Sequence, residues 1–265
     1  MAFPSPVRAA PRVLQLLSQL HKTSLEQEAV ISANTSISNG KKVFSTEILG
    51  SLEGKGQANN AKDDFDRLML DKFIALDEDK CHFTYQLINS MNATNIVEAG
   101  TSFGVSTIYL ALAIARTKAA TGKSGVVIGT EKEAEKAAIA RKYWAQCGPE
   151  VEQEIDLREG DLLETLKSDL PTVDLLLLDS TFDIPFTRVK IRALKKTIVW
   201  APLALPTLKV VLPRLRPGAV VLTDNTIKGN QGYADLLAYL RAPESGFQNM
   251  TLPFSNGFEM SVYRP

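Results

Sequence analysis

Residues 97–111, VEAGTSFGVSTIYLA, contain the pattern from which the fold class is predicted. This stretch joins a short apolar run to a turn containing Gly100 and Gly104, and the turn leads into an apolar pattern with helical spacing. The two glycines allow a sharp turn and a close approach of a ligand to the backbone, because they carry no Cβ. A strand, a glycine-containing turn and a helix in this order predict the first unit of a parallel α/β sheet.

Short β-branched runs and helical patterns alternate beyond this stretch. The predicted strands are 96–98, 126–129, 155–159, 173–179 and 219–223, and the predicted helices are 105–115, 134–146, 162–168, 205–215 and 233–240. Two more strand-like runs, 247–253 and 258–263, flank Ser255-Asn256-Gly257, which is a hairpin signal. The sequence therefore predicts a Rossmann-like, doubly wound α/β sheet that closes with an antiparallel C-terminal hairpin.

A helical N-terminal extension is expected over residues 1–82. Apolar residues recur with helical spacing over 13–20 and again over 65–74. The segment 36–60 between them is rich in Ser, Gly, Asn and Lys, which predicts a flexible loop that acts as a lid. The main domain is expected over 83–265, with a basic insertion at 181–199.

Composition excludes several classes of partner. The 265 residues include 30 Lys and Arg against 30 Asp and Glu, so the formal net charge is zero and no nucleic-acid partner is expected. No apolar run approaches the roughly 20 residues of a membrane span, and Pro4, Pro6 and Pro11 interrupt the N-terminal segment where a signal peptide needs an apolar run. Cys81 and Cys147 are too few for a disulfide scaffold. We expect a cytoplasmic protein with a small-molecule partner and no membrane partner.

Acidic residues stand at the ends of three predicted strands. Glu98, directly before Gly100, disfavours a pyrophosphate and suits a ligand with a positive centre, although an acidic residue at a helix start is an alternative. Glu131 is placed to accept both ribose hydroxyls of a nucleoside, or to favour the start of the next helix. Asp161, after Gly160, is a candidate partner for an adenine amino group or a helix cap.

Two other strands end in oxygen-bearing side chains. The run 173–179 is almost wholly apolar until Asp179, and the run before Asp224 and Asn225 has the same character. Carboxylate and amide oxygens on adjacent strand ends are the ligands that Mg²⁺ prefers. An Asp-Asn turn is the alternative interpretation of the second pair.

Five motifs in order resemble the class I S-adenosylmethionine-dependent methyltransferases, and within them the catechol and caffeoyl-CoA O-methyltransferase group. These motifs are VEAGTSFGVSTIYLA, GTEKEAEKAAIARKYW, REGDLLETL, VDLLLLDS and LRPGAVVLTDN. The resemblance covers roughly 83–264 and implies a seven-stranded sheet with an antiparallel last strand. It also implies a possible homodimer, for which the N-terminal helices are candidates.

The resemblance further implies site residues. The first motif would line the methionine part of S-adenosyl-L-methionine, Glu131 would bind the ribose and Asp161 would lie by the adenine. Asp179, Asp224 and Asn225 would hold Mg²⁺, which binds two vicinal acceptor oxygens, and Asp179 is the implied catalytic residue. The full set implied for the cofactor is Glu98, Gly100, Thr101, Ser102, Gly104, Ser106, Glu131, Gly160, Asp161 and Asp179.

The sequence departs from the family pattern at the general base. Relatives follow the fourth-strand aspartate with a Trp-Lys segment, but here the best match is Trp200-Ala201, so an alanine stands where the lysine is expected. Lys195, Lys196 and Lys228 are the remaining candidates for the base.

The sequence thus predicts an O-methyltransferase for an aromatic or polyketide-like metabolite, assisted by a divalent cation. A catalytically impaired cofactor-binding or interaction protein is one alternative, because the lysine is missing. A nicotinamide-dependent oxidoreductase is another, although the GxGxxG fingerprint is absent.

Overall fold

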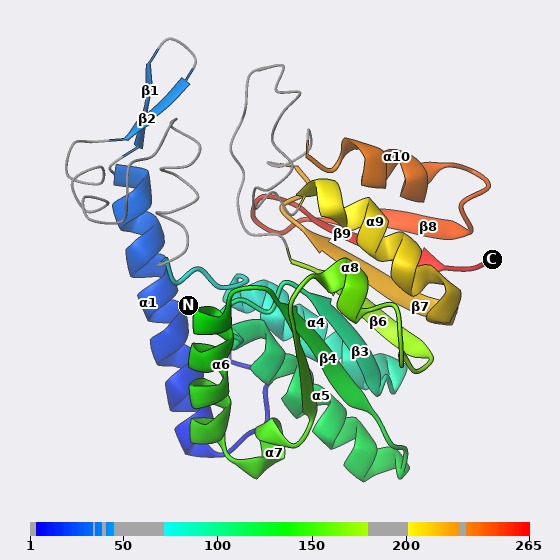
Figure 1. Ribbon diagram of the computed structural model, residues 1–265. Coiled ribbons are helices and arrows are strands. Elements are labelled where there is room, and N and C mark those ends of the chain that lie inside the picture. Colours follow the sequence, from blue (N-terminus) through cyan, green and yellow to red (C-terminus); the bar gives the residue numbers. More distant parts are fainter. Residues whose placement is uncertain (1–3, 34, 39–40, 45–71, 180–200, 228–231) are drawn as a thin grey trace.

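The computed structural model describes residues 4–33, 35–38, 41–44, 72–179, 201–227 and 232–265 (Figure 1). Its centre is a seven-stranded sheet with the order β5-β4-β3-β6-β7-β9-β8. The strands are β3 (Asn95–Ala99), β4 (Val126–Glu131), β5 (Ile155–Glu159), β6 (Val173–Leu178), β7 (Leu215–Asp224), β8 (Phe247–Leu252) and β9 (Phe258–Tyr263). The first five are parallel and β9 is antiparallel to both of its neighbours, β7 and β8. The predicted seven-stranded sheet with an antiparallel C-terminal hairpin is confirmed.

Helices cover both faces of this sheet (Figure 1). One face carries α4 (Glu78–Met91), α5 (Val105–Thr121), α6 (Ala134–Cys147) and the short α7 (Pro149–Glu152). The other carries α8 (Leu162–Thr165), α9 (Ala201–Val211), which is followed by a 3₁₀ turn over Leu212–Arg214, and α10 (Ala234–Arg241). Strand residues alternate between the two faces: Ile96, Leu175 and Leu177 join the first hydrophobic cluster, while Val97, Leu176 and Leu178 join the second.

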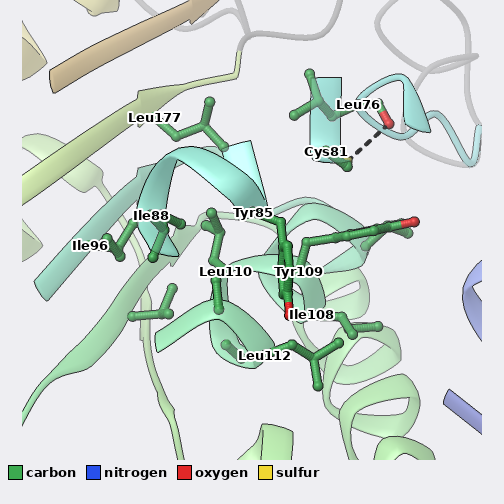
Figure 2. Close-up of a cluster of buried hydrophobic side chains, with 14 of the residues drawn as sticks. Leu76, Cys81, Tyr85, Ile88, Ile96, Ile108, Tyr109, Leu110, Leu112 and Leu177 are labelled. Carbon is green, nitrogen blue, oxygen red and sulfur yellow. Dashed lines mark hydrogen bonds between the residues drawn. The ribbon is translucent and has the colours of Figure 1, made fainter. Parts of the chain in front are cut away.

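Buried hydrophobic side chains of α4 and α5 pack together in one cluster (Figure 2). Tyr85 and Ile88 of α4 and Ile108, Tyr109 and Leu110 of α5 are at most 1% exposed. Most of α5 is buried, against α4, α7 and the strands β3 and β4, and its sequence is accordingly apolar on most sides.

The N-terminal region differs in part from its prediction. Helix α1 (Pro11–Ala33) contains the predicted apolar stripe and packs beside α6. The helix predicted over 65–74 is wrong at its C-terminal end, because residues 72–77 are not helical and α4 begins only at Glu78. Residues 45–71 lie outside the described part of the chain.

A short hairpin lies where only a loop was expected. Strands β1 (Thr35–Ser38) and β2 (Lys41–Phe44) pair in antiparallel fashion. Both strand sequences contain β-branched residues, and the sequence between them, Asn39-Gly40, is typical of hairpin turns. Within the described ranges, none of the helices combines the length and apolar character that a bilayer crossing requires.

Candidate active site

The site lies at the carboxyl ends of β3, β4 and β6, at the point where the strand order of the sheet reverses. From β3 the chain proceeds to β4 and β5 on one side and then returns to β6 on the other side of β3. In an open α/β sheet, ligands bind at such a switch point.

The glycine turn after β3 has a backbone that requires glycine. Gly100 and Gly104 have φ values of 97° and 76°, and Ser102 between them has a φ of 49°. A Cβ on Gly100 would lie 2.4 Å from the carbonyl oxygen of Asp179, and a Cβ on Gly104 would lie 2.6 Å from Nε1 of Trp144. The Trp144 indole also donates a hydrogen bond to the Gly104 carbonyl oxygen, at 3.0 Å. The two glycines therefore allow the turn to pack against the end of β6 and against α6.

Glu98 lies beneath this turn and is 0% exposed. Its carboxylate accepts hydrogen bonds from Thr101 Oγ1 at 2.9 Å, Ser106 Oγ at 2.6 Å and Thr107 Oγ1 at 2.6 Å. Burial raises the pKa of Glu98, and these three hydroxyl groups oppose the rise. Glu98 and Ser106 thus fix the turn to the start of α5, and their contact with the methionine part of a cofactor stays a prediction.

Glu131 ends β4 and holds the other side of the turn. It is 3% exposed, and its Oε2 accepts a hydrogen bond from the Ser102 backbone N–H at 2.8 Å. Its Oε1 accepts from the backbone N–H groups of Lys132 and Glu133, both at 2.8 Å. Burial raises the pKa of Glu131, whereas these N–H groups and nearby Lys136 lower it. The carboxylate is therefore held firmly at the edge where a ribose is predicted to bind.

Asp161 follows β5 and is exposed. Its Oδ1 accepts a hydrogen bond from Leu163 N at 2.9 Å, so it caps α8 as the alternative interpretation states. The preceding Gly160 has a φ of 123°, and its N–H donates to the Glu131 carbonyl oxygen at 2.9 Å. The structure thus joins the β5 turn to the β4 turn, and the adenine role of Asp161 stays a prediction.

Asp179 ends β6 beside the glycine turn. Its backbone N–H donates to the Ala99 carbonyl oxygen at 3.3 Å, and its side-chain Oδ1 is buried with no hydrogen-bond partner among the described residues. Burial raises the pKa of Asp179 well above its ordinary value, and the charges of Asp224 and Glu98 add to the rise. An apolar pocket adjoins this carboxylate and is lined by Ala99, Leu162, Leu178, Asp179, Leu203, Ala204 and Thr207. A buried carboxylate oxygen without a donor is a position where a ligand with N–H groups or positive charge gains most.

Asp224 ends β7 and forms a buried ion pair that the sequence analysis missed. Lys80 Nζ lies 2.6 Å from Asp224 Oδ1 and 2.9 Å from Asp77 Oδ2, and the Lys80 side chain is 1% exposed. Burial tends to lower the pKa of Lys80, but the charges of Asp224 and Asp77 outweigh it and raise the pKa. Burial raises the pKa of Asp224 to about 6 against the opposing charge of Lys80. A signal was present in the sequence, because Lys80 stands four residues before Thr84 and eight before Ile88 on the buried stripe of α4.

The residues predicted to hold Mg²⁺ do not fit a divalent cation as they are arranged. Both oxygens of Asp224 accept hydrogen bonds, Oδ1 from Lys80 and from the Asn225 N–H at 2.8 Å, and Oδ2 from Asn225 Nδ2 at 2.9 Å. In the described part of the chain, no cluster of three or more His, Cys, Asp or Glu side chains is placed to hold a metal ion. Of the three predicted ligands, Asp179 alone has a buried side-chain oxygen without a donor among the described residues.

The lysines predicted as candidates for the general base lie outside the described residues. Lys195 and Lys196, with the predicted insertion at 181–199, lie outside the described residues, as does Lys228. Ala201, which stands where relatives have a lysine, is the first residue of α9.

The sequence of this chain matches one family model. Residues 97–226 match a family model described as a methyltransferase domain. A comparison with curated proteins finds no match.

Solved structures with the same fold include two described as O-methyltransferases and one, from Klebsiella pneumoniae, described as a putative O-methyltransferase. One from Klebsiella pneumoniae has a TM-score of 0.60 at 19% identity and covers 98% of this chain and 93% of its own. One from Bacillus cereus, in complex with SAH, has a TM-score of 0.58 at 18% identity. The match covers 83% of this chain and 98% of the Bacillus cereus chain. TomG from Streptomyces achromogenes, involved in tomaymycin synthesis and in complex with SAM, has a TM-score of 0.56 at 19% identity and covers 83% and 96%.

Proposed function

Because residues 97–226 match a family model described as a methyltransferase domain, we propose that the chain is an S-adenosylmethionine-dependent O-methyltransferase that acts on a small metabolite. The observation that carries the proposal is the meeting of three elements at the switch point. Gly100 in the turn after β3 lies so near the carbonyl oxygen of Asp179, directly after β6, that a Cβ would come within 2.4 Å of it. The Ser102 N–H of the same turn donates to Glu131 at the end of β4.

The residues at this point fit S-adenosylmethionine. Glu131 has its two oxygens anchored at the strand end where ribose hydroxyls would bind. The buried Oδ1 of Asp179 faces no donor among the described residues, so it is free to accept from the amino group of the methionine part. Asp161, which follows β5, is proposed to lie by the adenine.

The residues of this chain contribute to the reaction by binding the methyl donor and by excluding water. S-adenosylmethionine, when bound, supplies a methyl group on a positively charged sulfur, which the acceptor oxygen displaces in line. The buried carboxylates Glu131 and Asp179 orient the donor, and their low exposure keeps water from competing for those contacts. No step is assigned to a divalent cation, because the residues at the end of β7 do not fit one.

The acceptor is proposed to be a small aromatic or polyketide-like molecule. The zero net charge supports this class over a nucleic acid, which needs clustered Lys and Arg. TomG, which shares the fold, is involved in tomaymycin synthesis. A homodimer stays a prediction, which light scattering of the purified protein tests.

Calorimetric titration tests the cofactor. We expect S-adenosylmethionine to bind with micromolar affinity and NAD to give no heat, because the GxGxxG fingerprint of dinucleotide sites is absent from the turn after β3. Glu131→Ala is expected to abolish binding, since it removes both the ribose contact and the acceptor that holds the Ser102 N–H.

The matched control is Glu135→Ala, which removes an exposed carboxylate in the first turn of α6. It is expected to bind S-adenosylmethionine as the wild type does. Absence of heat from S-adenosylmethionine with folded wild-type protein would contradict the proposed function.

A further inference from the structure

A lysine side chain occupies the position at the end of β7 where a metal ion was predicted. Lys80 belongs to the first turn of α4, which precedes β3, and it reaches across to the carboxyl end of β7. Asp77, the residue before α4, completes the group. We call Lys80, Asp77 and Asp224 the Lys80 cluster.

Within the Lys80 cluster the pair of Lys80 and Asp224 is buried, whereas the Asp77 side chain is 31% exposed. Lys80 is 0% exposed and Asp224 is 4% exposed, so the pair at 2.6 Å has little solvent around it. The Lys80 ammonium also lies 5.9 Å from the centre of the Phe258 ring, and Phe258 pairs with Asp224 across β9 and β7. A buried carboxylate needs a positive partner, because desolvation of an unpaired charge is costly, and here the partner is part of the chain itself.

The ammonium competes directly with a divalent cation. Oδ1 of Asp224 already receives Lys80 Nζ and the Asn225 N–H, and the Asn225 side chain turns its amide nitrogen toward Oδ2. A cation bound to either oxygen would meet the positive charge of Lys80 within a few ångströms, in a region where solvent screening is weak.

We propose that Lys80 is the resident cation of this site and takes the place of the divalent cation that the family resemblance implies. The wild-type protein then binds no divalent cation through Asp224. The absence of divalent-cation binding at Asp224 is inferred from the Lys80 cluster alone. A consequence of it, methyl transfer without added metal, rests on the proposed function as well.

Titration with Mn²⁺ alone, followed by the electron paramagnetic resonance signal of the free ion, tests the binding claim without cofactor or acceptor. The wild type is expected to bind no more Mn²⁺ than Asp224→Asn. Lys80→Met removes the ammonium and is expected to bind Mn²⁺ about tenfold or more tightly than the wild type, because the repulsion is removed and Asp224 Oδ1 loses its strongest donor. The double variant Lys80→Met/Asp224→Asn is expected to lose this gain.

Lys118→Met is the matched control, since Lys118 also forms an ion pair, with Glu154 at 2.6 Å, away from the Lys80 cluster. It is expected to bind Mn²⁺ as the wild type does. If Lys80→Met fails to fold, the comparison of wild type with Asp224→Asn decides alone. Binding of one Mn²⁺ per wild-type chain that Asp224→Asn removes overturns the proposal, as does a folded Lys80→Met with no gain. Failure of S-adenosylmethionine to bind would instead contradict the proposed function and leave the Mn²⁺ result intact.

Discussion

Gly104 has a left-handed backbone conformation and lies against the indole ring of Trp144. Its φ of 76° disfavours any residue with a Cβ, and the ring of Trp144 fills the space that a Cβ would need. The turn that carries Thr101 and Ser102 is therefore fixed from behind by α6. This arrangement predicts that the turn tolerates no side chain at residue 104.

Gly104→Ala is expected to destabilise the protein more than Gly122→Ala. Gly122 has a similar φ of 70°, but a Cβ there would meet nothing within 4 Å. Gly122→Ala should cost only the strain of the left-handed backbone, about 1–2 kcal/mol. Gly104→Ala adds a clash with Trp144, which costs roughly 1–3 kcal/mol more. Urea unfolding of the two variants measures the difference, and equal losses would contradict the role of Trp144.

Individual residues could be predicted only where a local pattern fixed them. The positions of Glu98, Glu131 and Asp179 near strand ends follow from strand patterns that stop at a charge. The structure places Glu98 one residue before the end of β3, Glu131 at the end of β4 and Asp179 directly after β6. Lys80 was missed because its partner Asp224 is 144 residues away, and no spacing rule links the two. The partners of Glu98 were also missed, because which of its neighbours turn inward depends on the turn geometry.

At the scale of elements, α1 is attached to the sheet domain by several contacts. Val13, Leu17 and Leu20 are buried, and Arg12 donates to the Cys147 carbonyl oxygen at 2.7 Å at the end of α6. His21 Nε2 lies 2.8 Å from the hydroxyl oxygen of Tyr109 on α5. Because His21 is 6% exposed, this contact joins α1 to the core.

Stability is expected to fall below pH 6.5, in part because of His21. Burial lowers the pKa of His21 below its ordinary value of 6.5, so the folded chain binds fewer protons than the unfolded chain as pH drops below that value. His21→Gln should therefore lose less stability between pH 7 and pH 5 than the wild type. His82→Gln is the comparison, because burial also lowers the pKa of His82, whose side chain is 22% exposed. Urea unfolding at the two pH values measures these changes, and identical slopes for wild type and His21→Gln would contradict the assignment.

The elements of the sheet were predicted well because β3, β4, β6 and β7 contain apolar runs that turn residues bound. Strands β5 and β9 begin and end at the predicted residues. Strand β7 begins at Leu215, earlier than predicted, because Pro217 and Gly218 are accommodated at an irregularity in its pairing with β6. The hairpin β1–β2 was missed because its polar composition outweighed the Asn39-Gly40 signal.

At the scale of the whole molecule, one hydrophobic cluster joins α1 to the sheet. It contains Val13 and Leu17 of α1 together with Tyr109, Trp144 and Phe258. The predicted boundary at residue 82 falls inside α4, which spans Glu78–Met91. Among the described residues, the extension therefore shares its core with the main domain.

A shared core predicts a single cooperative unfolding transition. Far-ultraviolet circular dichroism follows all helices, whereas Trp144 fluorescence, measured in a Trp200→Phe background, follows α6 alone. Leu17→Ala should shift both transitions together by about 2–5 kcal/mol, because Leu17 is 3% exposed and its truncation leaves a cavity in the common cluster. Leu25→Ala on the same helix is the control, since Leu25 is 62% exposed and its change should stay within about 0.5 kcal/mol. A Leu17→Ala variant that loses helical signal before the Trp144 signal changes would show instead that α1 unfolds independently, and the boundary near residue 82 would then separate two cooperative units.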